Sequence, residues 1–331
     1  MKETFKRIFS LFLRFGVSII LLIFLFGKVD EKALFTAIAH SNKYLLFLAF
    51  LVFFLSCFLC LLRWEMLLKA VKIHLPFKRV VISYAGGIFF SLFLPSTIGG
   101  DLMRSIDLAA HTKRPREVIA TVLLDRLSGY VGLVILALAA ILIGWNCVQD
   151  PSVLVSVGII AAVLLFVLLV LFNKSIYAKI NKLLHSPNAG KIRSLIKDSH
   201  EEIHYFKHHK KIIFNNLLLS VLIQGSGPLV FYIIALALGI KISLIYFFVF
   251  IPIIGAITLL PISIGGLGLR DATVIFFFAK AGVVKDMAFA MSLMNFFFIL
   301  VCGVLGGLIY VLTVRHRRIQ HHQPSPVHPQ A

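Results

Sequence analysis

Charged residues are scarce in this chain, and acidic residues are the scarcest of them. Only 14% of its 331 residues are charged, and 33 lysines and arginines stand against 14 aspartates and glutamates, for a net charge of +19. Soluble domains carry about 25% charged residues and are about 45–50% apolar, whereas this chain is 60% hydrophobic. The shortage of charge leaves little room for a soluble catalytic domain and predicts an integral membrane protein.

Signatures of common catalytic sites are also missing. The sequence has no P-loop, nucleophile elbow, zinc-protease motif or dinucleotide-binding fingerprint. We therefore predict no catalytic residue, no metal and no cofactor, and nothing indicates nucleotide-driven transport. The four cysteines give no disulfide framework, because Cys57 and Cys60 lie in an apolar run that is typical of buried thiols. No small-residue cleavage site follows the N-terminal apolar run, which we interpret as a retained span.

The sequence does contain a series of long apolar runs. A helix needs about 20 apolar residues to cross the hydrocarbon core, and lipid favours helices because the backbone must satisfy its own hydrogen bonds. The runs predict an all-α polytopic membrane protein with six full spans, at about 8–26, 44–62, 118–144, 153–172, 212–238 and 288–313. Gln224–Pro228 breaks the fifth of these spans, either as a kink that lines a cavity or for close helix packing. Gly303–Gly307 predicts a small-residue packing face.

Two further apolar regions are too short to cross the bilayer. Residues 80–94 stop at Pro95 and residues 244–260 stop at Pro261, and a Gly-Gly pair and a second short segment follow each proline. Proline ends a helix and paired glycines permit a tight turn. Each region therefore predicts a re-entrant hairpin of two half-length helices, or eight or more spans in total if the hairpin arms cross. Such broken backbone is tolerated only against protein or a watery cavity.

The two hairpins share sequence. Leu94–Arg104 aligns without gaps on Leu260–Arg270, and Leu, Pro, Ile, Gly, Gly and Arg recur at a constant offset of 166 residues. An odd number of spans separates the copies, so we predict inverted repeats, with halves at roughly 1–150 and 151–314 of a single transmembrane domain. Inverted repeats with interrupted helices at matching positions point to the central site of a transporter.

The repeated segments supply the candidate binding residues. A half-helix that begins after a glycine pair offers N–H groups to an anion, and the arginine that follows carries a planar fork suited to phosphate. The predicted substrate-binding residues are Pro95, Gly99, Gly100, Asp101, Arg104, Pro261, Gly265, Gly266, Arg270 and Asp271. Two alternatives stay open: the arginines pin the hairpins through structural ion pairs, or Asp101 and Asp271 carry protons or cations.

A second set of intramembrane charges supports these residues: Arg63, Glu65, Asp107, Asp125 and Arg126. Asp101, Arg104 and Asp107 are spaced i, i+3 and i+6, so Arg104 is able to pair with either acid. Asp125 and Arg126 are neighbours that point about 100° apart on a helix, so we predict partners for them on another helix, with Arg63 and Glu65 as candidates. These charges tether the helices or line a cavity.

The distribution of basic residues indicates the orientation. The loop 173–211 carries nine lysines and arginines, and 63–79, 113–116 and the segment after the last span are also basic, whereas 145–152 has no basic residue. Cytoplasmic loops carry this excess. We therefore predict a multi-pass protein of the cell membrane with both termini, the basic loop 173–211 and a disordered tail, 315–331, in the cytoplasm. The predicted partners are membrane lipids with anionic headgroups, and nucleic acid is not among them. The sequence does not give the oligomeric state.

Several of these segments together resemble a known family. Arg63-Trp64, the Pro-x-x-x-Gly-Gly-x-x-x-Arg pattern of 95–104, Asp125–Gly129 and the repeated Gly-Gly-x-Gly are similar to the lysylphosphatidylglycerol synthase transmembrane-region (flippase-like) family, over about residues 8–314. The resemblance implies lipid translocation without naming the lipid, and stand-alone members also carry polyprenyl-phosphate sugar labels. Bifunctional members add a cytosolic aminoacyltransferase domain. Only 17 residues follow Val314 here, so we expect no aminoacyl-lipid synthesis.

The leading interpretation is a translocase that moves an anionic phospholipid or a polyprenyl-phosphate-type lipid by alternating access. Arg104 and Arg270 would hold the headgroup. The alternative is a membrane-embedded transferase that acts on lipid-linked phosphate, with Asp101, Asp125 or Asp271 as base or metal ligand. A third interpretation is a lipid-organising scaffold without turnover. The repeated arginine and the scattered acids favour transport over enzymatic activity, because a translocase needs both orientations of one site.

Overall fold

The protein is helical throughout the part of the chain that the computed structural model describes: Leu25, Gly27 and residues 31–94, 98–145, 151–172, 210–258, 263 and 266–320. Within those ranges every regular element is a helix, which confirms the predicted all-α fold. In chain order the helices are α2 (Glu31–Ala39), α3 (Lys43–Ala70), α4 (Phe77–Ser91), α5 (Ile98–Thr112), α6 (Pro115–Ile143), α7 (Pro151–Phe172), α10 (Lys210–Ala237), α11 (Leu244–Ile257), α12 (Leu269–Lys280) and α13 (Lys285–Gln320).

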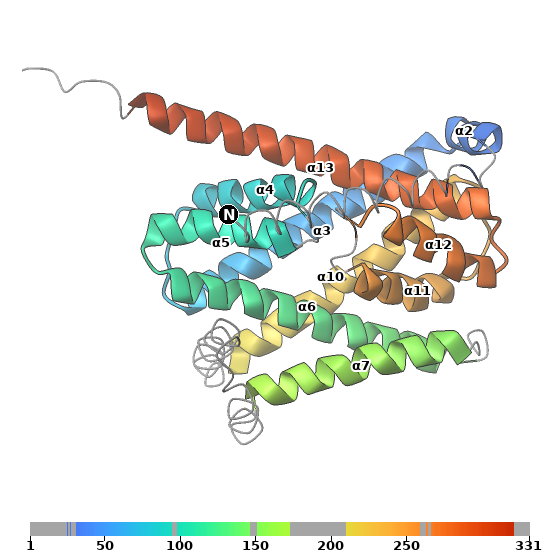
Figure 1. Ribbon diagram of the computed structural model, residues 1–331, viewed down its shortest axis with the longest axis horizontal. Helices are drawn as coiled ribbons and strands as arrows, with labels where there is room; N and C mark the ends of the chain where they lie inside the picture. The colour runs from blue at the N-terminus through green and yellow to red at the C-terminus, as the bar shows by residue number, and fades with distance from the viewer. Residues whose placement is uncertain are drawn as a thin grey trace, which may run out of the picture.

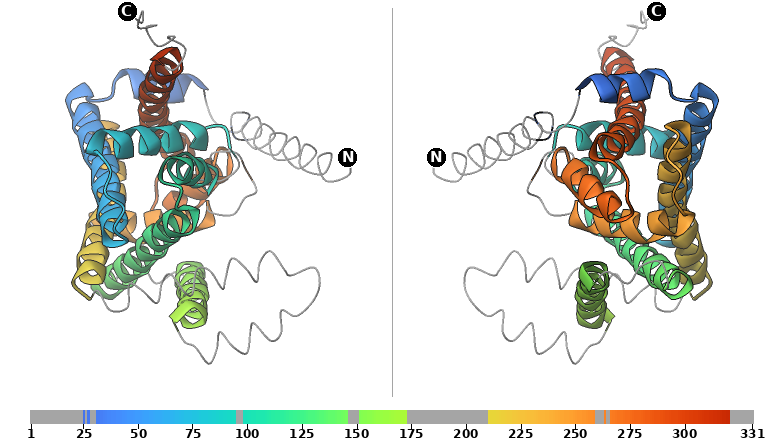
Figure 2. Two further views of the ribbon diagram at one scale, coloured as in Figure 1. Left: turned by 90° about the vertical axis from the view of Figure 1, so that its left-hand side faces the viewer. Right: turned by 90° about the vertical axis from the view of Figure 1, so that its right-hand side faces the viewer.

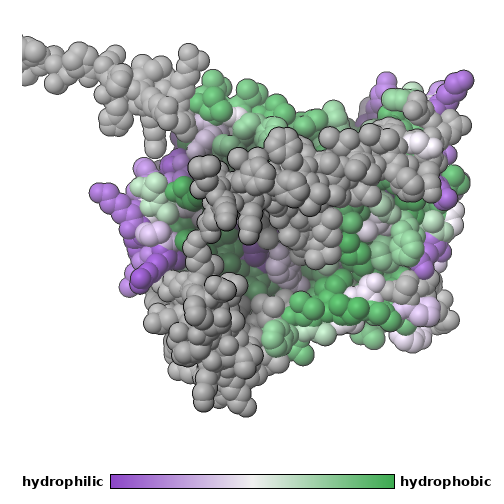
Figure 3. Space-filling model, viewed as in Figure 1, coloured by the Kyte–Doolittle hydropathy of each residue, from purple (hydrophilic) through white to green (hydrophobic). Residues whose placement is uncertain are grey.

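Four of these helices, α3, α6, α10 and α13, are long and apolar enough to cross a membrane. They cover four of the predicted spans, and α7 coincides with a fifth at 153–172. The predicted span 8–26 lies outside the described residues apart from Leu25. Large apolar side chains such as Phe54, Leu142 and Leu222 point outward along these helices, and Figure 3 shows hydrophobic surface between hydrophilic ends. Such a surface is that of a multi-pass membrane protein.

Both predicted hairpins are pairs of short helices. Helices α4 and α5 have 15 residues each, α11 has 14 and α12 has 12, so each reaches about 18–23 Å, short of the ~30 Å hydrocarbon core. Helix α4 packs on α5, and α11 packs on α12. In Figure 1 the first pair lies toward the end of the long axis where α3 ends and α6 begins, and the second lies toward the end where α10 ends and α13 begins. The two hairpins enter the molecule from opposite ends.

Each hairpin rests on its own apolar core. Trp64, Leu67 and Leu108 belong to a buried cluster formed by α3, α4, α5 and α6. Phe247 and Phe278 belong to a larger cluster that joins α10, α11, α12 and α13. Helix α7 lies at the outer edge, against α6 and α11 (Figure 2). The two hairpins are therefore separate packing units attached to one frame of long helices.

Small residues bring α13 against the first hairpin. A Cβ atom on Gly306 would lie 2.7 Å from the carbonyl oxygen of Ala85 on α4, closer than real side-chain contacts allow. Gly303 and Gly307 lie in the same way against Leu92 and Phe89. The predicted packing role of residues 303–307 is confirmed, and it seats α4 directly on α13.

The span 212–238 coincides with α10, but the predicted break within it and the predicted start of the tail differ from the structure. Helix α10 runs unbroken from Lys210 to Ala237 with Pro228 inside it, because proline removes one backbone hydrogen bond but neighbouring helices hold the segment in place. Helix α13 continues through Gln320, so residues 315–320 are helical and do not belong to a disordered tail.

The glycine pairs also differ from the prediction. Gly99 and Gly100 lie in the first turn of α5 rather than in a turn between helices. A Cβ atom on Gly100 would collide with the Ser91 hydroxyl and the Gly87 carbonyl oxygen, so Gly100 lets the two arms of the hairpin touch. Gly266 has φ of +76° just before α12, a conformation that glycine adopts readily. Among the glycines of the two pairs that the structure describes, Gly266 is the one that serves a turn as predicted.

Candidate functional site

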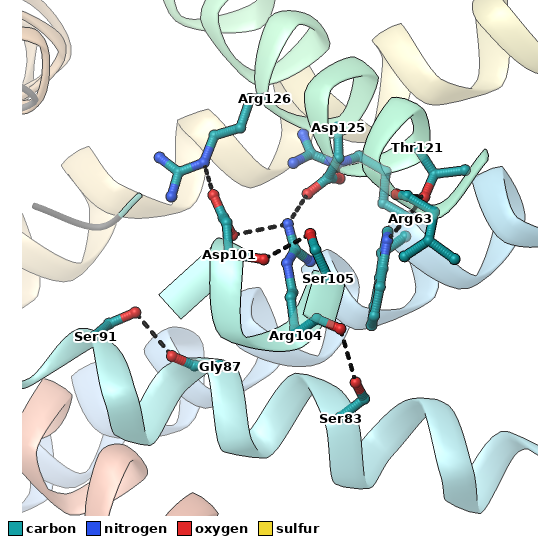
Figure 4. A network of polar contacts seen from close by, with 12 residues as sticks. Arg63, Ser83, Gly87, Ser91, Asp101, Arg104, Ser105, Thr121, Asp125 and Arg126 are labelled. Carbon is teal, nitrogen blue, oxygen red and sulfur yellow. Dashed lines mark hydrogen bonds and ion pairs between the residues drawn. The ribbon is translucent and has the colours of Figure 1, made fainter. Parts of the chain in front are cut away.

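Five charged side chains meet where the first hairpin contacts α3 and α6: Arg63, Asp101, Arg104, Asp125 and Arg126. We call them the five-charge cluster (Figure 4). Arg63 Nε donates to Asp125 Oδ1 at 2.7 Å, and Arg104 Nη2 donates to Asp125 Oδ2 at 2.9 Å. Arg104 Nη2 also lies 3.0 Å from Asp101 Oδ1, while the other oxygen of Asp101 accepts a hydrogen bond from Arg126. One continuous network therefore joins α3, α5 and α6.

The network decides between the alternatives predicted for Asp125 and for Arg104, and Asp101 is the acid of its own helix that pairs with Arg104. Arg63 does pair with Asp125. Glu65, the other candidate, instead pairs with Lys69 at 2.8 Å on its own helix. Asp107 does not reach Arg104 and pairs with Arg79 of α4 at 2.8 Å. Spacing along one helix permits both pairings of Arg104, but the packing of α4 against α5 decides between them.

Arg104 is the most enclosed member of the five-charge cluster. Its guanidinium carbon lies 4.6 Å from the centre of the Trp64 ring and 5.2 Å from that of Tyr84, and its side chain is only 4% exposed. Its Nε and Nη1 atoms are buried without any hydrogen-bond partner. A buried donor left unpaired costs about 1–3 kcal/mol. Arg104 thus keeps donor capacity that its two aspartates do not use.

Several polar residues that the sequence did not single out support the cluster. Ser220 of α10 accepts a hydrogen bond from Arg63 Nη1 at 2.9 Å, and Thr121 accepts one from the indole of Trp64 at 3.3 Å. Arg79 was counted only as a basic loop residue, yet it holds α4 to α5 through Asp107. Arg79 lies in the first turn of α4, and α5, the other arm of the hairpin, carries the acid Asp107. This combination in the sequence could have indicated the pair. Lone serines and threonines in apolar spans carry no comparable signal.

The second hairpin holds its charges differently. Arg270 Nη2 lies 3.3 Å from Oδ1 of its neighbour Asp271, and Arg270 Nε donates to the Ser292 hydroxyl at 3.2 Å. Ser292 also bonds to Asp271 Oδ1. The remaining oxygen of Asp271 accepts the backbone N–H of Gly268 at 2.9 Å and caps α12. The fully buried carboxylate of Asp271 therefore binds the N-terminus of α12, where the sequence predicted that an anion of the substrate would bind.

The structure does not bring the two arginines of the repeat to one point. Arg104 lies in the second turn of α5 and bonds across to α6, whereas Arg270 lies in the first turn of α12 and bonds toward α13. Pro95, Pro261 and Gly265 lie outside the described residues. The matched sequence positions give two separate arginine sites, one in each hairpin.

A cavity of about 290 Å³ lies between α3, α10, α11, α12 and α13. Its polar lining consists of Ser56, Gln224, Ser226, Thr258, Arg270 and Asn295. The segment 224–228 therefore lines a cavity, one of the two alternatives for it. Gln224 also reaches the other site, because its Nε2 donates to the Gly129 carbonyl oxygen at 2.8 Å. A Cβ atom on Gly129 would lie 3.6 Å from Arg63. Arg270 therefore lines the cavity directly, and Gln224 links it to the segment of α6 that lies next to Arg63.

The acids of the site are arranged to balance arginines. Both oxygens of Asp125 accept from arginine, and both oxygens of Asp101 contact arginine. Across the described ranges, no three His, Cys, Asp or Glu side chains gather in a way that could hold a metal ion. This arrangement favours charge compensation over general-base chemistry.

Comparisons with known proteins agree with this architecture along nearly the whole chain. The model of the family described as the lysylphosphatidylglycerol synthase TM region matches residues 11–307. A UPF0104 membrane protein of Pyrococcus horikoshii is 23% identical over 92% of this chain and 96% of its own length. Two UPF0104 membrane proteins of Methanothermobacter thermautotrophicus are 24% and 26% identical, over 93% and 84% of this chain and 93% and 87% of their own lengths.

Proposed function

This chain belongs to the lysylphosphatidylglycerol synthase transmembrane-region family, and from that premise we propose that it is a lipid translocase. It moves an anionic phospholipid, or a polyprenyl-phosphate-type lipid, across the cell membrane by alternating access. The negatively charged phosphate binds arginine within the bundle, while the acyl or prenyl tails stay in the surrounding lipid. The protein supplies charge compensation and a polar path, and it performs no chemical step on the lipid.

The observation that carries this proposal is the state of Arg104. Its guanidinium is buried against the Trp64 and Tyr84 rings, which also contact each other, and two of its donor atoms have no partner among the described residues. Ionisable residues at membrane depth are costly and mark substrate pathways by default. A phosphate oxygen would accept from Nε or Nη1, and guanidinium binds phosphate through paired donors. The unused donors and the carboxylates beside them match a site that exchanges one anion for another.

Asp101 is the carboxylate that a lipid phosphate would replace. Its side chain is 16% exposed, against 6% for Asp125. Asp101 belongs to the α4–α5 hairpin, which in this proposal moves during transport. Arg126, which shares Asp101, is 24% exposed and forms the outer edge of the five-charge cluster. A phosphate would therefore arrive past Arg126, displace Asp101 and engage Arg104, while Asp125 keeps the hairpin attached to α6.

Alternating access follows in this proposal from an inverted repeat. The two hairpins enter from opposite ends (Figure 1), each carries an arginine at the matched position, and a cavity with several polar side chains adjoins Arg270. Transporters built from inverted repeats expose one central site first to one side and then to the other. Arg104 would receive the headgroup from one leaflet, and Arg270 would release it to the other.

The orientation is part of the proposal. The end that holds the α3–α4 and α5–α6 connections carries Lys72, Lys78, Lys113, Arg114 and Arg116. Lys69 at the end of α3 and Lys210 and Lys211 at the start of α10 bring the basic residues of this end to eight, whereas the opposite end carries five among the described ranges: Lys32, Lys43, Lys241, Lys280 and Lys285. By the positive-inside rule the first end faces the cytoplasm, together with both termini. The first hairpin then opens to the cytoplasmic leaflet.

Reconstitution of the full chain into liposomes tests the proposal. Acyl-labelled lipids keep their natural headgroups, and their transfer between leaflets is followed by quenching the label from outside. We expect protein-dependent transfer of phosphatidylglycerol and none of phosphatidylcholine, whose headgroup has no net negative charge. Transfer of neither phosphatidylglycerol nor a labelled polyprenyl phosphate, or equal transfer of phosphatidylcholine and the anionic lipids, contradicts an anion-selective translocase.

A further inference from the structure

The cavity that adjoins Arg270 is lined by six polar residues and by eight apolar residues or glycines. Its polar groups are three hydroxyls, two carboxamides and the guanidinium of Arg270, namely Ser56, Ser226, Thr258, Gln224, Asn295 and Arg270. The described lining includes no carboxylate and no lysine. Polar groups inside a bundle are costly unless they find partners, so an occupant that bonds to these groups would be favoured over a purely apolar one.

Two of these groups have capacity that the protein does not use. Asn295 of α13 is 8% exposed, and no hydrogen bond joins its amide to another described residue. The Nε2 atom of Gln224 donates a hydrogen bond to the Gly129 carbonyl oxygen, and its Oε1 atom is able to accept a hydrogen bond from an occupant. A carboxamide both donates and accepts. Together the pair presents donors and acceptors from two helices, which is the pattern that recognises hydroxyl groups.

The hydroxyl groups of the lining are held in place by hydrogen bonds within the protein. The hydroxyl of Ser226 donates to the Ile223 carbonyl oxygen and lies 2.7 Å from that of Ser56, which links α10 to α3. Thr258 donates to the Gly255 carbonyl oxygen at 2.8 Å. Each of these oxygens keeps a lone pair for an incoming donor. The occupant is therefore expected to carry hydroxyls of its own.

The charges around the cavity exclude an amine. Arg270 is positive and lines the cavity, and the nearest acid, Asp271, is fully buried with both oxygens bonded to Gly268, Arg270 and Ser292. An ammonium group in the cavity would be repelled by Arg270 and would find no free carboxylate among the described lining residues to pair with. The low dielectric constant of the membrane interior increases both the cost of this repulsion and the cost of an unpaired charge. A phosphate at one end and an uncharged alcohol in the middle suit the same cavity.

We propose that this cavity is a specificity site for the uncharged part of the headgroup, and that it selects a phosphodiester whose alcohol is a polyol without an amine. The proposal rests on the proposed translocation and names its substrate class. The volume of about 290 Å³ is at the lower edge of small-molecule sites, so it holds a headgroup and not a whole lipid. The phosphate binds an arginine while the hydroxyls bind Asn295 and Gln224.

The test compares lipids that differ only in the alcohol. Phosphatidylglycerol and phosphatidylmethanol carry the same single negative charge, but only the first has free hydroxyls, and phosphatidylethanolamine adds an amine. Two new hydrogen bonds at about 0.5–1.5 kcal/mol each correspond to roughly tenfold. We expect the native chain in liposomes to move phosphatidylglycerol about tenfold faster than phosphatidylmethanol, and to leave phosphatidylethanolamine in place.

Variants assign the preference to the cavity. Asn295→Leu is expected to slow phosphatidylglycerol to the rate of phosphatidylmethanol and to leave the latter rate unchanged. Asn215→Leu, on the exposed face of α10, is the matched control and is expected to keep the preference. Thr258→Val repeats the test with a nearly isosteric change, and Thr273→Val, outside the lining, is its control.

The outcomes separate this inference from the proposed function. Equal rates for the two anionic lipids, or an Asn295→Leu effect on both alike, overturn the polyol site while translocation stands. Transport of phosphatidylethanolamine at the rate of phosphatidylglycerol also overturns it. If no anionic lipid moves, translocation itself fails and the inference fails with it.

Discussion

Arg104 on the first hairpin and Asp125 on the long helix α6 are joined by a hydrogen-bonded ion pair of 2.9 Å, with both side chains almost fully buried. The other oxygen of the same carboxylate binds Arg63 of α3 at 2.7 Å. A single acid therefore compensates two arginines and fastens the hairpin to two long helices.

Replacing Asp125 is expected to destabilise the protein strongly. Asp125→Ala leaves Arg63 and Arg104 without their shared counter-ion, and breaking a buried pair from one side costs about 3–5 kcal/mol. Thermal unfolding in detergent measures the loss as a lower Tm. Glu65→Ala is the control, because Glu65 pairs with a Lys69 side chain that is 55% exposed, and such pairs contribute about 0–1 kcal/mol. A similar drop in both variants would contradict the role given to Asp125.

Arg104→Lys is expected to impair transport with little effect on folding. Lysine keeps the positive charge but loses the planar fork that binds two phosphate oxygens. The transfer rate of phosphatidylglycerol should fall about tenfold or more, as expected for a lost charge-assisted hydrogen bond. Arg79→Lys is the matched control, since Arg79 is equally buried on the same hairpin and binds Asp107 outside the five-charge cluster. Equal loss in the two variants would show that only the hairpin packing is sensitive.

Gly306→Ala is expected to loosen the first hairpin from α13. The added Cβ would lie 2.7 Å from the Ala85 carbonyl oxygen, a backbone atom that cannot turn aside, and overpacking costs about 1–3 kcal/mol. Gly158→Ala on α7 is the control, because nothing lies within 4 Å of the added atom. Unfolding in detergent should show a lower Tm for the first variant alone. An unchanged Tm for Gly306→Ala would mean that the two helices are not in backbone contact.

Cysteine labelling tests the opposite entry of the two hairpins. In a cysteine-free background, single cysteines at Phe77 and His111, the outer ends of α4 and α5, should both label from the cytoplasmic side. Cysteines at Lys241 and Val284, which flank α11 and α12, should both label from the outer side. A hairpin whose two ends label from different sides crosses the membrane, and this result would remove the basis for an inverted repeat.

Much of the architecture follows from the sequence because it depends on local properties. The length of each apolar run predicts α3, α6 and α10, and the prolines that cut short the runs before Pro95 and Pro261 predict the half-length helices. The pairing of Arg63 with Asp125 was also within reach, since both charges lie at a similar depth in neighbouring spans and need partners.

The remaining features depend on how the helices pack against one another, which periodicity along one helix does not encode. Asp107 binds Arg79 rather than Arg104 because α4 lies against α5. Gly100 closes a helix contact where a turn was predicted, and Asn295 and Gln224 line one cavity because α13 and α10 both border it. Such pairs are 70 or more residues apart in the chain or come from different arms of a hairpin, so no local sequence pattern predicts them.

The most direct test of the account measures transport by a charge-balanced variant of the first site. Arg104→Gln alone changes the net charge of the five-charge cluster, whereas the double variant Asp101→Asn, Arg104→Gln removes one charge of each sign and keeps Asp125 paired with Arg63. Arg126 loses its pair with Asp101 in the double variant, but it is 24% exposed, so the expected cost is smaller than for a buried pair. The account predicts that the double variant folds with a Tm near that of the native chain but no longer moves phosphatidylglycerol between the leaflets of liposomes. Transfer at the native rate by this well-folded variant would show that Arg104 only pins the hairpin, and would contradict anion binding as the basis of function.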